Sequence, residues 1–207
     1  MGKRGNMTKE EMIGQIILEE YRMFSSVQNI GGRAFCQDDY DTFYIMRSAQ
    51  HGIFGMGMLE SYRRDIREAQ MAGRNLAAEK YAWMMEVTDP VWFEEKLRAY
   101  LPKGSGRKML LVERMTWVFM ECYEGVKKRY PNMLASGRNP YDNREGASIQ
   151  LYFSGELKTW SEATLLLACQ DIISHLEERR NPVCMIYEKI MELYSCRKDL
   201  AEGRFSV

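Results

Sequence analysis

The sequence lacks most of the motifs by which an enzyme is usually recognised. It contains no phosphate-binding P-loop, no G-x-S-x-G serine motif and no H-E-x-x-H zinc motif. It has only two histidines and an odd number of cysteines, five, none of them spaced as C-x-x-C. We therefore expect no structural metal site, no disulfide framework and no cofactor, and the free cysteines are typical of a cytoplasmic protein.

The sequence also lacks net charge and long hydrophobic runs. Lysine and arginine number 29, and aspartate and glutamate also number 29, so no overall field favours nucleic acid as a partner. No apolar run approaches the roughly 20 residues that a membrane-spanning helix needs. We expect neither a nucleic-acid nor a membrane partner, and the oligomeric state stays open.

The residues that are present indicate helices. Hydrophobic residues make up 45% of the chain, enough for a sizeable core, and they recur at spacings of three and four. No stretch alternates as a strand would. Helix starts are predicted at a capping box, Thr8 to Glu11, at Asn75 and at Ser161. We predict an all-α fold of about nine helices.

Two of these helices carry more specific expectations. The first should run from Lys9 to a stop at Gly31-Gly32, where glycine allows the left-handed conformation. Asp38 or Asp39 should cap the second, whose centre, 43–46, is apolar on every side. We expect that second helix to be buried.

The spacing also predicts an internal duplication. A shift of 106 positions aligns identical residues that lie at helix starts and on helix faces: Leu59 with Leu165, Asp65 with Asp171, Asn75 with Asn181, and Tyr81 with Tyr187. A shift of 105 aligns Gly32-Arg33 with Gly137-Arg138. We predict two similar helical halves, residues 1–103 and 107–207, packed as one globular unit.

Several short motifs resemble those of a known bacterial family. They are Gly31-Gly32-Arg33-Ala34, Cys36-Gln37-Asp38-Asp39, Gly73-Arg74-Asn75-Leu76 and Gly155-Glu156-Leu157-Lys158-Thr159. The sequence is similar to the family known as domain of unknown function 4125, but it departs from that family at 51–54, where tryptophan is usual. The resemblance implies a domain that covers nearly the whole chain and a bacterial origin, and it implies no enzyme class.

The densest group of reactive side chains follows the first helix. Polar side chains occur there beyond what a helix stop and a cap require: Arg33, Cys36, Gln37, Asp38 and Asp39. Arg47 and Gln50 follow on one stripe of the second helix, and Arg138 is the counterpart of Arg33 in the second half. We predict that these residues bind a small polar or anionic ligand, which the arginines would hold.

Other interpretations stay open. Arg47 on an apolar helix needs either an acid from another segment or a bound anion. The aspartates at 38, 39 and 41 could hold Mg²⁺ or Ca²⁺, although clustered acids at a helix start are typical of capping. Cys36 precedes a helix start, where a thiol can be activated. The protein could instead be a regulatory or scaffold module that binds a protein partner, and whether it is an enzyme stays open.

Overall fold

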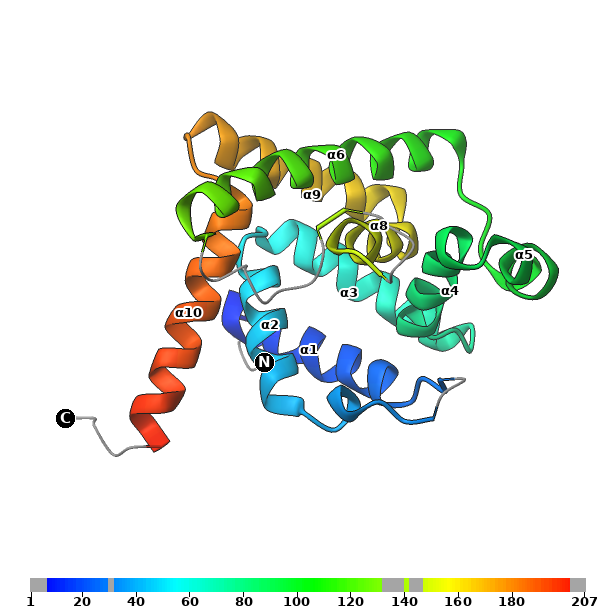
Figure 1. Cartoon of the computed structure of the whole chain (residues 1–207), viewed down its shortest axis with the longest axis horizontal. Helices are drawn as coiled ribbons and strands as arrows, with labels where there is room; N and C mark the ends of the chain where they lie inside the picture. The colour runs from blue at the N-terminus through cyan, green and yellow to red at the C-terminus, as the bar shows by residue number, and fades with distance from the viewer. Residues whose placement is uncertain (1–6, 30–31, 132–139, 142–146, 202–207) are drawn as a thin grey trace, which may run out of the picture.

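The computed structural model describes residues 7–29, 32–131, 140–141 and 147–201, with side chains as far as 196 (Figure 1). Within these ranges the chain forms nine α-helical segments and no strand, which confirms the predicted all-α fold. The α-helices are α1 (Lys9–Ser25), α2 (Tyr40–Gly52), α3 (Met56–Met71), α4 (Leu76–Thr88), α5 (Pro90–Trp92), α6 (Gly106–Arg129), α8 (Ile149–Thr159), α9 (Glu162–Glu177) and α10 (Pro182–Ala201). Shorter turns are the 3-10 helices η1 (Phe35–Gln37) and η3 (Arg98–Tyr100) and the π-helix η2 (Phe93–Leu97).

The predicted helix starts are confirmed by their caps. The Thr8 hydroxyl accepts from the backbone N–H of Glu11, whose carboxylate in turn accepts from the N–H of Thr8. The side chains of Asp39, Asn75 and Ser161 each accept a hydrogen bond from the first turn of α2, α4 and α9. These bonds satisfy backbone donors that a helix start otherwise leaves unpaired.

Two expectations about the first helices were wrong. Helix α1 ends at Ser25, so Gly32, with φ of +88°, does not stop the helix but lies in the following loop. Helix α2 is not buried on every side, because Tyr44 and Met46 are exposed while Ile45 is buried. The reason is that α2 packs against α1 and α10 and is left open between them.

Helix α8 lies near the centre of the molecule and packs against α4 and α6 (Figure 1). The approach of α8 to α4 depends on Gly155, because a Cβ there would lie 2.9 Å from Met84 Cγ and 3.0 Å from the Lys80 carbonyl oxygen. One core cluster joins both halves of the sequence: its fully buried members include Ile16, Leu59, Leu157 and Leu165. Residues far apart in the chain are therefore held side by side.

Pairs of residues 106 positions apart play matching roles around α3 and α9. Asp171 accepts a hydrogen bond from the backbone N–H of Gly55 (2.8 Å), and Asp65 accepts one from that of Ser161 (2.8 Å). Each aspartate thus caps the helix that carries the other. Gly73 and Arg179, which follow the ends of α3 and α9, both have positive φ. These matches agree with the predicted duplication, which itself stays a prediction.

Candidate functional site

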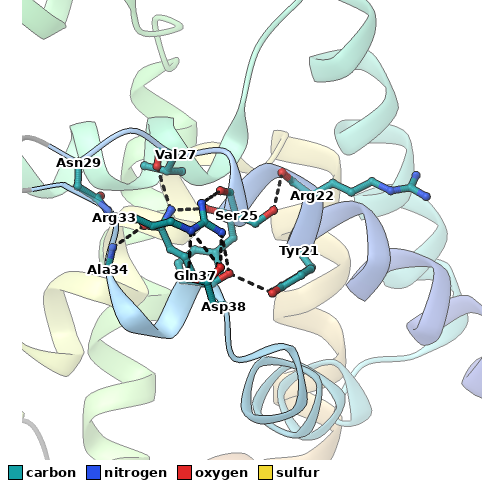
Figure 2. Close-up of polar contacts among 10 residues, drawn as sticks. Tyr21, Arg22, Ser25, Val27, Asn29, Arg33, Ala34, Gln37 and Asp38 are labelled. Carbon is teal, nitrogen blue, oxygen red and sulfur yellow. Dashed lines mark hydrogen bonds and ion pairs between the residues drawn. The ribbon is translucent and has the colours of Figure 1, made fainter.

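The loop after α1 is organised around the side chain of Gln37, which is buried (Figure 2). Its amide nitrogen donates to the carbonyl oxygens of Phe24 (3.0 Å) and Val27 (2.9 Å). Its oxygen accepts from Asn29 Nδ2 (2.7 Å) and from the backbone N–H of Ala34 (2.9 Å). Gln37 therefore ties the end of α1 to the loop, and its amide is fully occupied by the chain itself.

Arg33 and Asp38 bond each other on the surface of this loop (Figure 2). Arg33 Nη2 lies 2.6 Å from Asp38 Oδ1, and Arg33 Nη1 donates to the Ser25 carbonyl oxygen (2.7 Å). The side chains are 51% and 62% exposed. The hydrogen bond from Arg33 lowers the pKa of the Asp38 carboxyl. Cys36 is exposed, and Asp39 caps α2. The loop therefore carries one exposed ion pair and is joined to α1 by Gln37 and to α2 by Asp39.

Arg47 lies in a different setting, inside the helical packing. Its guanidinium donates to both carboxylate oxygens of Glu20 on α1, with Nε 2.8 Å from Oε2. Nη2 also pairs with Glu156 on α8 (2.7 Å), and Nη1 donates to Gln50 Oε1 (2.7 Å). The Arg47 side chain is only 12% exposed. Of the two alternatives for Arg47, an acid from another segment or a bound anion, the structure shows the first, with Glu20 and Glu156 supplied by two other helices.

Three further side chains, His51, Tyr62 and Lys80, join this group. We call the whole set the Arg47 cluster: Glu20, Arg47, Gln50, His51, Tyr62, Lys80 and Glu156. The Tyr62 hydroxyl donates to Glu20 Oε1 (2.7 Å), and His51 Nε2 lies 3.0 Å from Glu20 Oε2. Lys80 Nζ donates to Glu156 Oε2 (2.8 Å). The cations of Arg47 and Lys80 thus face the carboxylates of Glu20 and Glu156, as buried charges require.

The electrostatics of the cluster follow from burial and pairing together. Burial alone would raise the pKa of Glu20, but Arg47 and His51 outweigh burial and hold that pKa well below its usual range. Burial likewise opposes ionisation of Glu156, yet Arg47 and Lys80 lower its pKa to about 2. Both acids are therefore carboxylates at neutral pH.

A cavity of about 270 Å³ opens beside the cluster, between α2, α6, α8 and α10. We call it the α2–α10 cavity. Its walls are mainly aromatic and aliphatic, and they include Phe119, Tyr152, Phe153, Ile186, Tyr187 and Ile190. Charged and polar groups of the cluster, among them Arg47, Gln50 and Glu156, lie in the same wall. The arrangement is that of a ligand pocket, mostly apolar with a few placed polar groups.

Two ring nitrogens in this wall are buried without a hydrogen-bond partner among the described residues. They are His51 Nδ1 and Trp160 Nε1, and both side chains are at least 97% buried. Because the Glu20 carboxylate can only accept, the His51 nitrogen that faces it, Nε2, carries a hydrogen. The indole Nε1–H of Trp160 is a donor only. Both unpartnered atoms expose almost no surface, so they are exceptions to the rule that buried polar groups are paired.

A second cavity, of about 200 Å³, lies on the other side of the cluster, between α1, α2, α4 and α8. Its wall residues and those of the α2–α10 cavity correspond after the 106-residue shift: Phe43 with Ile149, Arg47 with Phe153, Leu76 with Pro182, Ala77 with Val183, Lys80 with Ile186, and Tyr81 with Tyr187. Arg47 and Lys80 thus have apolar counterparts. Arg47, Lys80 and Glu156 line both cavities, so the charged cluster lies between them.

The structure separates the residues selected from the sequence into two places. Arg47 and Gln50 bond each other in the wall of the α2–α10 cavity. The five residues at 33 and 36–39 lie in the loop after α1, and they line neither of the cavities described above. Arg138 lies outside the described residues.

Sequence reasoning missed the other members of the site, Glu20, His51, Lys80, Glu156 and Trp160. One signal was available: Glu20 lies four residues after Ile16 on the apolar stripe of α1, where an acid must find a partner. For His51 and Trp160 no local sequence pattern distinguishes a residue that lines a cavity from a residue of the ordinary core. Gly155, the residue before Glu156, allows α8 to pack closely against α4, and this packing brings Glu156 to Lys80.

The family model described as "Protein of unknown function (DUF4125)" matches residues 10–202. The chain belongs to this family. The match confirms the resemblance carried by the sequence motifs. No curated protein and no solved structure shows a significant match. The family description names no activity, so a function has to be inferred from the geometry of the site.

The described residues contain no group of three or more histidine, cysteine, aspartate or glutamate side chains arranged to hold a metal ion. No helix in these ranges combines the length and the apolar character needed to cross a membrane.

Proposed function

We propose that the protein binds a small molecule with an apolar body and one polar group in the α2–α10 cavity. The observation that carries this proposal is the cavity itself, which has a volume of about 270 Å³, mainly aromatic and aliphatic walls, and a few polar groups such as Gln50 and Glu156. A mostly apolar cavity with a few placed polar groups is typical of a small-molecule site. Arg47 and Gln50, two residues selected for ligand binding from the sequence, line the same cavity.

The proposal moves the ligand away from the loop that the sequence favoured. Gln37 has all its amide bonds within the chain, and Arg33 is neutralised by Asp38. We assign the loop a structural role, that of joining α1 to α2.

The alternative function, a scaffold that binds a protein partner through helical surfaces, has weaker support. The large apolar side chains that are exposed are distributed over many elements, for example Phe35 on η1, Met71 on α3 and Trp117 on α6, although some helices carry two of them. Single exposed apolar residues are common on any protein surface, whereas a docking site usually shows a contiguous patch.

The test is a thermal-shift screen of the full chain with small aromatic and aliphatic compounds. A ligand at 100 times its Kd stabilises the folded state by about 2.7 kcal/mol, which raises Tm by several degrees. Trp160→Phe should reduce the rise. The matched control is Trp83→Phe, because Trp83 Nε1 is also buried and unpartnered among the described residues but packs with Phe93 and Leu101 away from the cavity. Equal Tm rises in the two variants would place the ligand elsewhere.

A further inference from the structure

We infer that the polar group of the ligand is an anion of single charge, such as a carboxylate, and that the Lys80 ammonium binds it in the α2–α10 cavity. This inference rests on the proposed function, since it names the chemical class of molecule that the cavity would take. It keeps the anionic ligand expected from the sequence, but the group that holds the anion is a lysine instead of the arginines.

The position of the Lys80 ammonium is fixed by two residues of the cavity wall. Its Nζ donates to Glu156 Oε2 (2.8 Å) and lies 5.2 Å from the centre of the Tyr152 ring. Lys80, Tyr152 and Glu156 all line the α2–α10 cavity. The Lys80 side chain is 21% exposed, so it is not sealed within the helical packing. The ammonium therefore lies at the cavity wall, between a carboxylate and an aromatic ring.

The Lys80 ammonium can donate further hydrogen bonds. A lysine ammonium carries more than one N–H donor, and among the described residues Glu156 is the one hydrogen-bond acceptor found for Nζ. Arg47 differs, because its guanidinium is engaged with Glu20, Glu156 and Gln50. Turning Arg47 toward a ligand would break a buried ion pair. Lys80 can bond an added acceptor and still keep Glu156.

The charged side chains of the wall favour an anion over a cation. They are two cations, Arg47 and Lys80, and one carboxylate, Glu156. Glu20 lines the other cavity and not this one. His51 adds no negative charge in either protonation state. One negative charge on the ligand would balance the excess cation of the wall, and the pairing with Lys80 would offset the loss of hydration.

An ammonium ligand would find no free partner in the same wall. Its acceptor would have to be Glu156, whose oxygens are already paired with Arg47 Nη2 (2.7 Å) and Lys80 Nζ (2.8 Å). The two cations would in addition repel it. The wall is therefore selective for the sign of the charge.

The cavity volume limits the size of the molecule. A protein cavity of about 150 Å³ accommodates benzene. In proportion, the volume of about 270 Å³ found here would take a molecule of about eleven heavy atoms. An aromatic ring with a short chain that ends in a carboxylate fits this limit, and the aromatic walls suit such a ring.

The experiment compares four probes that share one body: phenylpropanoate, phenylpropanol, propylbenzene and phenylpropylamine. Their dissociation constants for the full chain are measured by calorimetry at about pH 7, where the acid is ionised and the amine is protonated. We expect phenylpropanoate to bind about tenfold more tightly than propylbenzene, because it gains a charge-assisted hydrogen bond. Phenylpropanol should lie between these two, and phenylpropylamine should bind most weakly.

A pair of matched variants tests the role of Lys80. Lys80→Met removes the ammonium and keeps the length of the side chain, so the preference for the acid over the hydrocarbon should be lost while propylbenzene still binds. The control is Lys158→Met, because Lys158 also bonds one glutamate, Glu86, and lies over one aromatic ring, that of Trp83 (5.1 Å). Lys158 lines neither of the two cavities, so its variant should keep the preference.

The outcomes separate this inference from the proposed function. If phenylpropanoate binds no more tightly than propylbenzene, or if the alcohol or the amine binds best, the inference is wrong and the cavity remains a binding site. The inference is also wrong if Lys80→Met keeps the preference for the acid, or if Lys158→Met loses it equally. The comparison of the probes on the unaltered chain decides the sign of the charge even if Lys80→Met does not fold. If none of the four probes binds, the proposed function fails together with the inference.

Discussion

Arg33 and Arg47 each bond both oxygens of one carboxylate, yet they occupy opposite environments. Arg33 meets Asp38, five residues along the chain, and both side chains are more than half exposed. Arg47 meets Glu20, 27 residues away, and both are nearly buried. The first pair is made by a single loop, whereas the second requires α1 and α2 to be packed. The same chemistry is therefore local and exposed in one place, and tertiary and buried in the other.

Solvent explains why the two pairs should differ in energy. Water screens an exposed pair and can replace either partner, so such pairs contribute little. A buried charge that loses its partner has no replacement, and its desolvation is then uncompensated. Arg47 also links Glu20 to Glu156, so its loss would leave these two carboxylates with Lys80 as the one remaining cation of the cluster.

The largest effect is expected from Arg47→Ala, which should lower the free energy of unfolding by about 3–5 kcal/mol. Denaturant unfolding followed by circular dichroism would measure it. Arg47→Lys should lie between this variant and the wild type, because it keeps the charge but loses the forked hydrogen bonds to Glu20. If Arg47→Ala does not fold, the unfolding free energy of Arg47→Lys still tests the prediction. An unchanged midpoint for both variants would contradict a buried ion network.

A somewhat smaller effect is expected from acid. The pKa of Glu156 is about 2 in the folded protein against 4.5 for the unperturbed group. Its carboxylate therefore stabilises the fold fully above about pH 5, and this contribution is lost as the pH falls toward 2. At about 1.4 kcal/mol for each tenfold change in an ionisation constant, the loss is on the order of 3 kcal/mol.

Unfolding free energies measured between about pH 6 and pH 2 would test the contribution of Glu156. Glu156→Gln should be less stable at neutral pH and should show a shallower fall with acid than the wild type. The control is Glu192→Gln, whose exposed carboxylate pairs with Lys189 on the same helix and should leave the slope unchanged. An acid profile of Glu156→Gln that parallels the wild type would mean that Glu156 gains nothing from Arg47 and Lys80.

The contrast between the pairs also explains what the sequence could and could not predict. Helix starts at Thr8, Asn75 and Ser161 were predictable because a cap acts within four residues. The need of Arg47 for a distant acid was predictable from its apolar helix, but its partners were not. Glu20 and Glu156 come together only through the packing of α1, α2 and α8, in which Gly155 allows α8 to approach α4. The cavity was not predictable either, since its wall draws on helices from both halves of the chain.

The smallest effect is expected from Arg33→Ala, and the loop itself offers the sharpest control. Arg33 is exposed and its removal leaves Asp38 in water, so the midpoint of unfolding should not change measurably. Gln37→Ala, four residues on, should instead lower stability by about 1–3 kcal/mol, because the part-buried carbonyls of Phe24 and Val27 would lose the hydrogen bonds donated by the Gln37 amide. If Arg33→Ala proved the more damaging of the two, the loop would depend on its ion pair rather than on its buried amide. Exposure would then be the wrong criterion for separating Arg33 from Arg47.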